Sequence, residues 1–320
     1  MNKKSRKYLE ATVVADTKNM SNEEWLKARQ MGIGGSDASA VVGCNPWKSA
    51  VQVYIEKKEE NPKQEEAFRM KLGHKLEQTV ADLFMEETGL KVKNVNGILQ
   101  NEKYPFAMAN IDRAVVGEKA FLECKTTNSF AAKEWECDMV PVHYAMQCLH
   151  YMAVTGATHC YIAVLIGNQD FKWQKLERDE ILINNLMELE REFWENNILK
   201  DELPVADGSD AFSRYIAERY NREEKGKTID LNYMDNIRDY LQRRDEIDNE
   251  MKALKEERNL IDQSIQLEMK EAEKATAGDR MITWKSQNRT SIDTKRLKAE
   301  LPEIAEKYSK TSTYRTFKVK

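Results

Sequence analysis

The chain has 320 residues, of which 32% are charged and 41% apolar, and its net charge is −4. This composition excludes a disordered chain, and the negative balance argues against a protein that coats nucleic acid non-specifically, although a local basic groove remains compatible with it. No apolar stretch approaches the roughly 18 residues that cross a bilayer, and no apolar signal core follows the basic N-terminus, so we expect no membrane contact and a cytoplasmic location.

The N-terminal part of the chain predicts several helices. Residues 21–24 (Ser-Asn-Glu-Glu) form a capping box that opens the first helix, and the glycine-rich turn Gly32–Asp37 leads into a second one. A further capped start is expected at Asn45. Residues 65–88 carry apolar side chains at helical spacing and predict a long amphipathic helix, for which Gly89 is a suitable C-cap.

Between residues 90 and 200 the pattern indicates short strands and further helices. Strands are expected at Val92–Val95, Gly97–Leu99, Ala107–Val116, Phe121–Lys125, His159–Ile166 and Asp170–Leu176. Helices are expected at 141–152 and from 180 to about 199. This order predicts an α/β fold with a central mixed sheet flanked by helices, and we assign residues 1–204 to it.

The C-terminal part differs in character. Residues 205–228 are polar and resemble a linker, and the stretch from Leu231 to about Lys274 lacks Gly and Pro. It predicts an amphipathic helix of roughly 65 Å if unbroken, whose imperfect heptads favour packing on its own protein or on a partner. Strands are expected at Asp279–Gln287 and Thr313–Lys320, around a helix near Thr294–Tyr308. Residues 229–320 are therefore expected to form a long helix and a small α+β extension.

The most informative chemical pattern is Asp112 followed by Glu123-Cys124-Lys125 across a predicted hairpin. Side chains alternate along a strand, so Glu123 and Lys125 point to one face and Cys124 to the other. Asp112 and Glu123 would give Mg²⁺ two carboxylates and the Cys124 backbone carbonyl a third oxygen. Lys125 would orient or activate the bound water. A surface hairpin with an ordinary Glu–Lys pair would give the same pattern.

Three further features each allow a functional and a plainer interpretation. Glu77 on the 65–88 helix is a supporting or second-metal acid, or a solvent-facing side chain. Arg29 and Ser36 bracket a glycine turn that opens a helix, which favours binding of a phosphate, unless Ser36 is only the N-cap. Gln147 bridges the attacking water or the phosphate, or is a polar residue on a half-buried helix.

Cysteines and histidines give little support to other metal chemistry. The five cysteines form an odd set without a C-x-x-C pair: Cys44, Cys124, Cys137, Cys148 and Cys160. Reduced thiols in a cytoplasm are the simplest account, and the even scatter of the last four disfavours an iron–sulfur or zinc site. The four histidines do not pair at ligand spacing, so they are interpreted as structural or surface groups.

The combined order of these motifs resembles the YqaJ-like viral recombinase family, phage-type alkaline exonucleases akin to lambda exonuclease. The resemblance spans approximately residues 25–200 and is carried by Arg29…Gly34-Gly35-Ser36-Asp37, Gly73-x-x-x-Glu77, Asp112, Glu123-x-Lys125 and Tyr144-x-x-Gln147-x-x-x-Tyr151. It implies a restriction-endonuclease-like PD-(D/E)xK fold and Mg²⁺-dependent phosphodiester hydrolysis, with Mn²⁺ as a substitute ion.

The resemblance also implies roles for the candidate residues. By it, Asp112 and Glu123 bind the metal, and Lys125 orients or activates the water. Glu77 and Gln147 support the site. Arg29 and Ser36 hold a terminal 5′-phosphate.

The substrate and partners are likewise expectations from the family. Its members degrade the 5′ strand of duplex DNA and leave 3′ overhangs for a single-strand annealing recombinase. We therefore expect a phage or prophage 5′→3′ exonuclease on double-stranded DNA ends, homo-oligomeric, in a bacterial host cytoplasm. The tail of roughly 90 residues is absent from the compact lambda enzyme. Two alternatives stay open, an endonuclease on the same fold and a catalytically inactive DNA-binding recombination scaffold.

Overall fold

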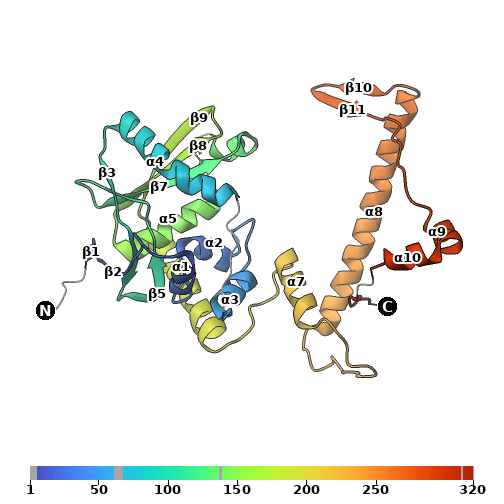
Figure 1. Cartoon of the computed structure of the whole chain (residues 1–320), viewed down its shortest axis with the longest axis horizontal. Coiled ribbons are helices and arrows are strands. Elements are labelled where there is room, and N and C mark those ends of the chain that lie inside the picture. The colour runs from blue at the N-terminus through green and yellow to red at the C-terminus, as the bar shows by residue number, and fades with distance from the viewer. Residues whose placement is uncertain (1–5, 61–67, 137–138, 311–312, 320) are drawn as a thin grey trace. The chain divides into compact units, whose positions relative to one another are not determined.

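The computed structural model describes residues 6–60, 68–136, 139–310 and 313–319. The chain divides into two units, Met1–Arg219 and Tyr220–Lys320 (Figure 1). The first unit includes α7 (Asp210–Arg219), which lies in the segment expected to resemble a linker and buries Phe212. Cys137 and residues 65–67 of the expected 65–88 helix lie outside the described residues.

A five-stranded mixed sheet forms the centre of the first unit. Its order is β3-β6-β7-β8-β9, with β7 and β8 parallel and the other neighbours antiparallel. The strands are β3 (Val92–Asn94), β6 (Arg113–Val115), β7 (Ala120–Thr127), β8 (His159–Ile166) and β9 (Asp170–Glu177). A parallel pair needs a crossover, which the chain makes through α5 (Val142–Thr155). The predicted central mixed sheet is confirmed.

A second sheet is antiparallel, in the order β1-β2-β4-β5. Its strands are β1 (Lys7–Tyr8), β2 (Ala11–Asp16), β4 (Gly97–Asn101) and β5 (Tyr104–Ala109). The single strand expected at Ala107–Val116 is therefore wrong, because β5 ends at Ala109 and β6 belongs to the mixed sheet. Between them, the Asp112 side chain accepts a hydrogen bond from the Cys124 N–H (2.8 Å) in place of a backbone acceptor.

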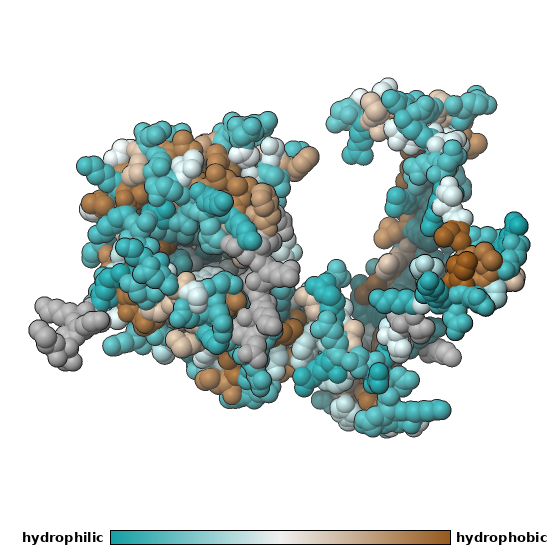
Figure 2. Space-filling view, viewed as in Figure 1, coloured by the Kyte–Doolittle hydropathy of each residue, from teal (hydrophilic) through white to brown (hydrophobic). Residues whose placement is uncertain are grey.

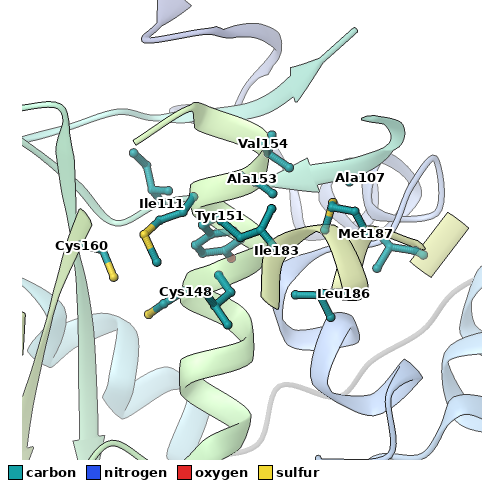
Figure 3. Packing of buried hydrophobic residues seen from close by; sticks show 14 of the residues in the cluster. Ala107, Ile111, Cys148, Tyr151, Ala153, Val154, Cys160, Ile183, Leu186 and Met187 are labelled. Carbon is teal, nitrogen blue, oxygen red and sulfur yellow. The ribbon is translucent and has the colours of Figure 1, made fainter. Parts of the chain in front are cut away.

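Helices cover both faces of the mixed sheet. On one face, α4 (Phe68–Thr88) packs Val80 and Phe84 against Leu122 of β7. On the other face, α5 lies between the sheet and α6 (Glu180–Phe193). Figure 3 shows this packing, with Cys148 of α5 beside Cys160 of β8, and with Ile183 and Leu186 of α6 on the opposite side of the Tyr151 ring.

The remaining helices of the first unit shape its N-terminal part and its end. They are α1 (Asn22–Arg29), α2 (Gly35–Val41), α3 (Ala50–Lys58), a 3₁₀ turn at Ser129–Trp135 and a π-helical turn at Trp194–Leu199 that extends α6. The predicted capping box of Ser21 and Glu24 is confirmed. The helix start expected at Asn45 is displaced to Ala50, because the Asn45 side chain instead accepts from the backbone N–H groups of the two residues after Pro46.

The second unit contains a long helix and small appended elements. They are α8 (Ile237–Met269), a hairpin of β10 (Lys274–Ala277) and β11 (Arg280–Thr283), α9 (Thr294–Glu300) and α10 (Pro302–Lys307). The helix expected near Thr294–Tyr308 is split in two, because Pro302 suits a first helical position and starts a new helix. The strand expected at Thr313–Lys320 is wrong over residues 313–319, which pair with no neighbouring strand, and Lys320 lies outside the described residues.

Helix α8 exposes many apolar side chains to solvent. Leu254 and Ile261 are among its exposed apolar residues, and Figure 2 shows brown side chains along this helix and around α9 and α10. Within the described part of the second unit, the buried residues are Met269 of α8 and Ala305 of α10. Among the described residues, no helix combines the length and the apolar character that crossing a membrane requires.

Candidate active site

Strand β7 sorts the side chains of Glu123, Cys124 and Lys125 onto two faces. Phe121 packs in the cluster that includes α5, whereas Leu122 and Cys124 pack in the cluster with α4. On the α5 face, the Lys125 ammonium lies 2.7 Å from Glu123 Oε1. The predicted alternation is therefore confirmed, and it delivers one carboxylate and one ammonium side by side.

Asp112 reaches this pair from the neighbouring strand. Its Oδ2 accepts a hydrogen bond from the Cys124 N–H at 2.8 Å, just before β6 begins. In an antiparallel pair, the N–H and C=O of one residue point to the same side. The Cys124 carbonyl therefore points to the side on which Asp112 lies. The predicted hairpin thus brings together Asp112, Glu123 and the Cys124 backbone.

Helix α5 closes the site from above the sheet. The Gln147 amide donates to Glu123 Oε1 at 2.6 Å and accepts from the Lys125 ammonium at 3.0 Å. The same ammonium lies 4.7 Å from the centre of the Tyr144 ring, and the Gln147 amide lies 3.3 Å from the Tyr151 hydroxyl. Residues three and four apart share a helix face, so Tyr144, Gln147 and Tyr151 all face β7.

The carboxylates of Asp112 and Glu123 would be stabilised by a bound cation. Glu123 is only 3% exposed, and its Oε2 has no hydrogen-bond partner among the described residues. A buried carboxylate oxygen without a partner is costly. Burial, followed by repulsion from the charges of Glu123 and Glu77, raises the pKa of Asp112 well above its usual range. Burial also raises the pKa of Glu123, against the opposing effect of Lys125.

The donor set fits a hard divalent cation. Mg²⁺ is typically bound by one or two carboxylates, with water and substrate phosphate completing its octahedron. Asp112, Glu123 and the Cys124 carbonyl are such donors. Across the residues that the structure describes, no three His, Cys, Asp or Glu side chains gather as a metal cluster, so the richer all-protein ligand set of a structural zinc site has no counterpart there.

Glu77 of α4 is connected to the site through Arg113. The Arg113 guanidinium contacts the Glu77 carboxylate and donates to the Asp112 carbonyl at 2.9 Å and to Gln78 at 3.3 Å. Arg113 is 7% exposed, so this fork ties α4 to the start of β6. Sequence reasoning missed Arg113, although a basic residue directly after a candidate metal ligand was a usable signal.

The glycine turn before α2 holds a second cluster of charges. The Arg29 guanidinium donates to the exposed Ser36 hydroxyl at 2.8 Å and lies 3.4 Å from Asp37. Asp37 is fully buried and also binds the ammonium groups of Lys48 (2.8 Å) and Lys57 (2.7 Å). Burial alone would raise the pKa of Asp37, but the three cations outweigh it and hold that pKa well below its usual range.

The sequence analysis proposed roles for Arg29 and Ser36 but none for the other members of this cluster. Asp37 directly follows the Gly-Gly-Ser turn, and its Oδ2 accepts from the Gly34 N–H at 3.1 Å. It therefore holds the turn as well as the cations. An acid in the first turn of a helix was the available signal for Asp37, whereas Lys48 and Lys57 gave none because their partner is distant in sequence.

The glycine turn with Arg29 and Ser36 lines a cavity together with Gln147 of α5. Its volume is about 120 Å³, and its lining consists of Trp25, Arg29, Gly34, Gly35, Ser36, Ile98, Met108, Ala109, Asn110, Gln147 and Tyr151. A Cβ atom on Gly35 would lie 2.5 Å from Tyr151 Cε1, so only glycine permits α2 to approach α5 this closely. Arg29 and Ser36 consequently open onto the same space as Gln147, which contacts Glu123 and Lys125 directly.

This architecture has relatives among known proteins. Residues 24–158 match the YqaJ-like viral recombinase domain. The YqaJ protein of Bacillus subtilis (strain 168) is 39% identical over 315 residues, which cover 97% of this chain and 98% of that protein. The match extends through the C-terminal unit, so the long helix is part of the shared chain.

Two solved structures show more distant similarity. An alkaline exonuclease (LHK-Exo) from Laribacter hongkongensis is 21% identical with a TM-score of 0.49, over 62% of this chain and all of that one. A phage-related exonuclease from Haemophilus somnus 129PT is 15% identical with a TM-score of 0.41, over 56% of this chain and all of that one. By its identity to the Bacillus protein over nearly the whole length, the chain belongs to the YqaJ family of viral recombinase-like proteins.

Proposed function

We propose that the chain is a metal-dependent deoxyribonuclease that hydrolyses the 5′ strand from the ends of duplex DNA. The observation that carries this proposal is the buried Glu123 Oε2, which has no hydrogen-bond partner among the described residues and lies beside Asp112 and the Lys125 ammonium. Asp112, Glu123 and the Cys124 carbonyl would hold Mg²⁺, or Mn²⁺ in its place. When bound, the ion supplies a Lewis acid for the scissile phosphate.

The side chains of the site have distinct tasks in this proposal. Lys125 positions the attacking water and balances charge that develops on the phosphate oxygens. Gln147 fixes the positions of the Lys125 ammonium and the Glu123 carboxylate, since its amide binds both. Glu77 acts through Arg113, which it orients against the Asp112 backbone.

The second cluster supports an exonuclease over an endonuclease. Arg29 and Ser36 are hydrogen-bonded to each other and line the same cavity as Gln147. A guanidinium and a hydroxyl are suitable donors for a terminal phosphate. In this proposal they hold the terminal 5′-phosphate of one strand, while the next phosphodiester bond of that strand lies at Lys125. Cleavage then requires a DNA end.

The biological setting follows from the family and is part of the proposal. The matched domain is described as viral recombinase-like, which fits a phage or prophage enzyme in a bacterial cytoplasm. Removal of the 5′ strand would leave 3′ overhangs for a single-strand annealing recombinase. A homo-oligomer is proposed as the working form.

The experiment compares four duplexes with Mg²⁺: linear with 5′-phosphate, linear with 5′-hydroxyl, nicked circular and closed circular. We expect fast loss of the phosphorylated linear form, slower loss of the hydroxyl form and intact closed circles. Nicking of closed circles would replace the exonuclease with an endonuclease. If no form is cleaved with either Mg²⁺ or Mn²⁺, the DNA-binding scaffold replaces both enzymes.

A further inference from the structure

An exposed tryptophan is held rigidly beside the site. Trp47 is 66% exposed, so a large part of its indole ring is accessible to a ligand. The turn is fixed from both sides: the Asn45 side chain accepts from the Trp47 N–H at 2.9 Å and donates to the buried Ser39 hydroxyl at 3.0 Å. The indole is therefore presented to solvent by a preorganised backbone.

A chain of ring contacts links Trp47 to the catalytic lysine. The indole meets the His143 ring edge to face, with 4.7 Å between ring centres. His143 contacts Tyr144 at 4.0 Å, and the Lys125 ammonium lies over the Tyr144 ring. In the other direction along the chain, Lys48 binds Asp37, which anchors the turn with Ser36. Trp47 is thus connected to both the catalytic and the phosphate-holding clusters.

We propose that Trp47 is the stacking platform for an unpaired nucleobase of the strand being cut. The inference rests on the proposed function, because a terminal nucleotide can reach a buried metal site only after it leaves the duplex. Unpairing and unstacking a base is unfavourable, and a base stacked on an aromatic side chain regains part of that energy whatever its identity.

Stacking, rather than charge, is the contribution that we assign to the turn around Trp47. The Lys48 ammonium lies 2.8 Å from Asp37 and 2.5 Å from Glu56, so it is held by carboxylates of the protein. Among the exposed residues of this turn, Gly43, Cys44, Pro46 and Trp47, the aromatic ring is that of Trp47. The ligand class is accordingly a single-stranded nucleotide of any base at or next to a 5′ end.

The test measures binding of a 5′-phosphorylated single-stranded oligonucleotide to metal-free protein by fluorescence anisotropy. Trp47→Ala is expected to weaken binding about tenfold, within the range for one stacked base, and Trp47→Phe to retain most of it. Trp284→Ala is the matched control, because Trp284 is 47% exposed but lies in the C-terminal unit; it should bind as the unaltered protein does. Thermal unfolding verifies that each variant is folded.

An abasic scan identifies the base itself as the ligand. Removing one base at a time from the first three nucleotides should weaken binding to the unaltered protein at one position, and that penalty should vanish in Trp47→Ala. An equal penalty in both proteins, or unchanged binding by Trp47→Ala, overturns the stacking role. Because no metal is present, these outcomes are independent of cleavage, whereas failure of the unaltered protein to bind any DNA would count against the proposed function itself.

Discussion

Replacing Lys125 with alanine is expected to lower the rate of DNA cleavage by about 10²- to 10⁴-fold, the range for removing a group that positions a proton or charge in the transition state. The ammonium lies within hydrogen-bond distance of Glu123 and Gln147 and over the Tyr144 ring. No other described lysine or arginine pairs with Glu123. The measurement is initial-rate cleavage of a 5′-phosphorylated linear duplex at saturating Mg²⁺.

The fold is expected to survive this change, because the Gln147 amide still donates to Glu123 Oε1. Lys119→Ala is the matched control: this lysine is exposed in the turn before β7, and its removal should leave the rate unchanged. Circular dichroism of Lys125→Ala should resemble that of the unaltered protein, whereas its thermal unfolding should shift to a lower temperature because the buried Glu123 loses its cation. Cleavage within a fewfold of the unaltered rate would remove Lys125 from the mechanism.

Replacing Asp37 with asparagine is expected to lower the free energy of unfolding by about 3–5 kcal/mol, the usual effect of removing one partner from a buried ion pair. Asp37 is fully buried and binds Arg29, Lys48 and Lys57. Without its charge, these cations repel one another, and Arg29 loses its carboxylate partner. Denaturant unfolding measures the loss, and the preference for 5′-phosphate over 5′-hydroxyl ends should shrink with it.

The stabilisation that Asp37 contributes is expected to depend on pH. The pKa of Asp37 is lower in the folded protein than in the unfolded chain, so its stabilisation is present above the unfolded value of about 3.9 and is lost as pH falls through the folded value. The difference in the free energy of unfolding between the unaltered protein and Asp37→Asn should therefore become smaller at acidic pH. Asp16→Asn is the control, since Asp16 forms an exposed pair with Arg6 and should change stability by less than about 1 kcal/mol. A similar small loss for Asp37→Asn would contradict the account.

Much of the site could be predicted because its signals are local in sequence. Alternation along one strand places Glu123 and Lys125 on the same face, and helical spacing places Gln147 between Tyr144 and Tyr151. These patterns follow from backbone geometry alone. The central mixed sheet was predictable for the same reason, since the periods of its strands and helices are visible in the sequence.

Other features depend on contacts between distant segments and gave no such signal. Between β5 and β6, the Asp112 side chain accepts a hydrogen bond from the Cys124 N–H. The apolar residues on both sides of Asp112 nevertheless predict a single strand. Strand β2 near the N-terminus is defined by pairing with β4, more than 80 residues away. Lys48 and Lys57 matter only because tertiary packing directs both toward Asp37.

Asp112 and Glu123 are proposed to form the metal centre of an end-dependent nuclease. The most direct test of this proposal adds Mg²⁺ to metal-free protein that holds a linear duplex labelled at its 5′-phosphate. The account predicts that labelled mononucleotide appears only after Mg²⁺ is added, and that Asp112→Asn releases almost none. Release before Mg²⁺, or release by Asp112→Asn at the unaltered rate, would contradict it.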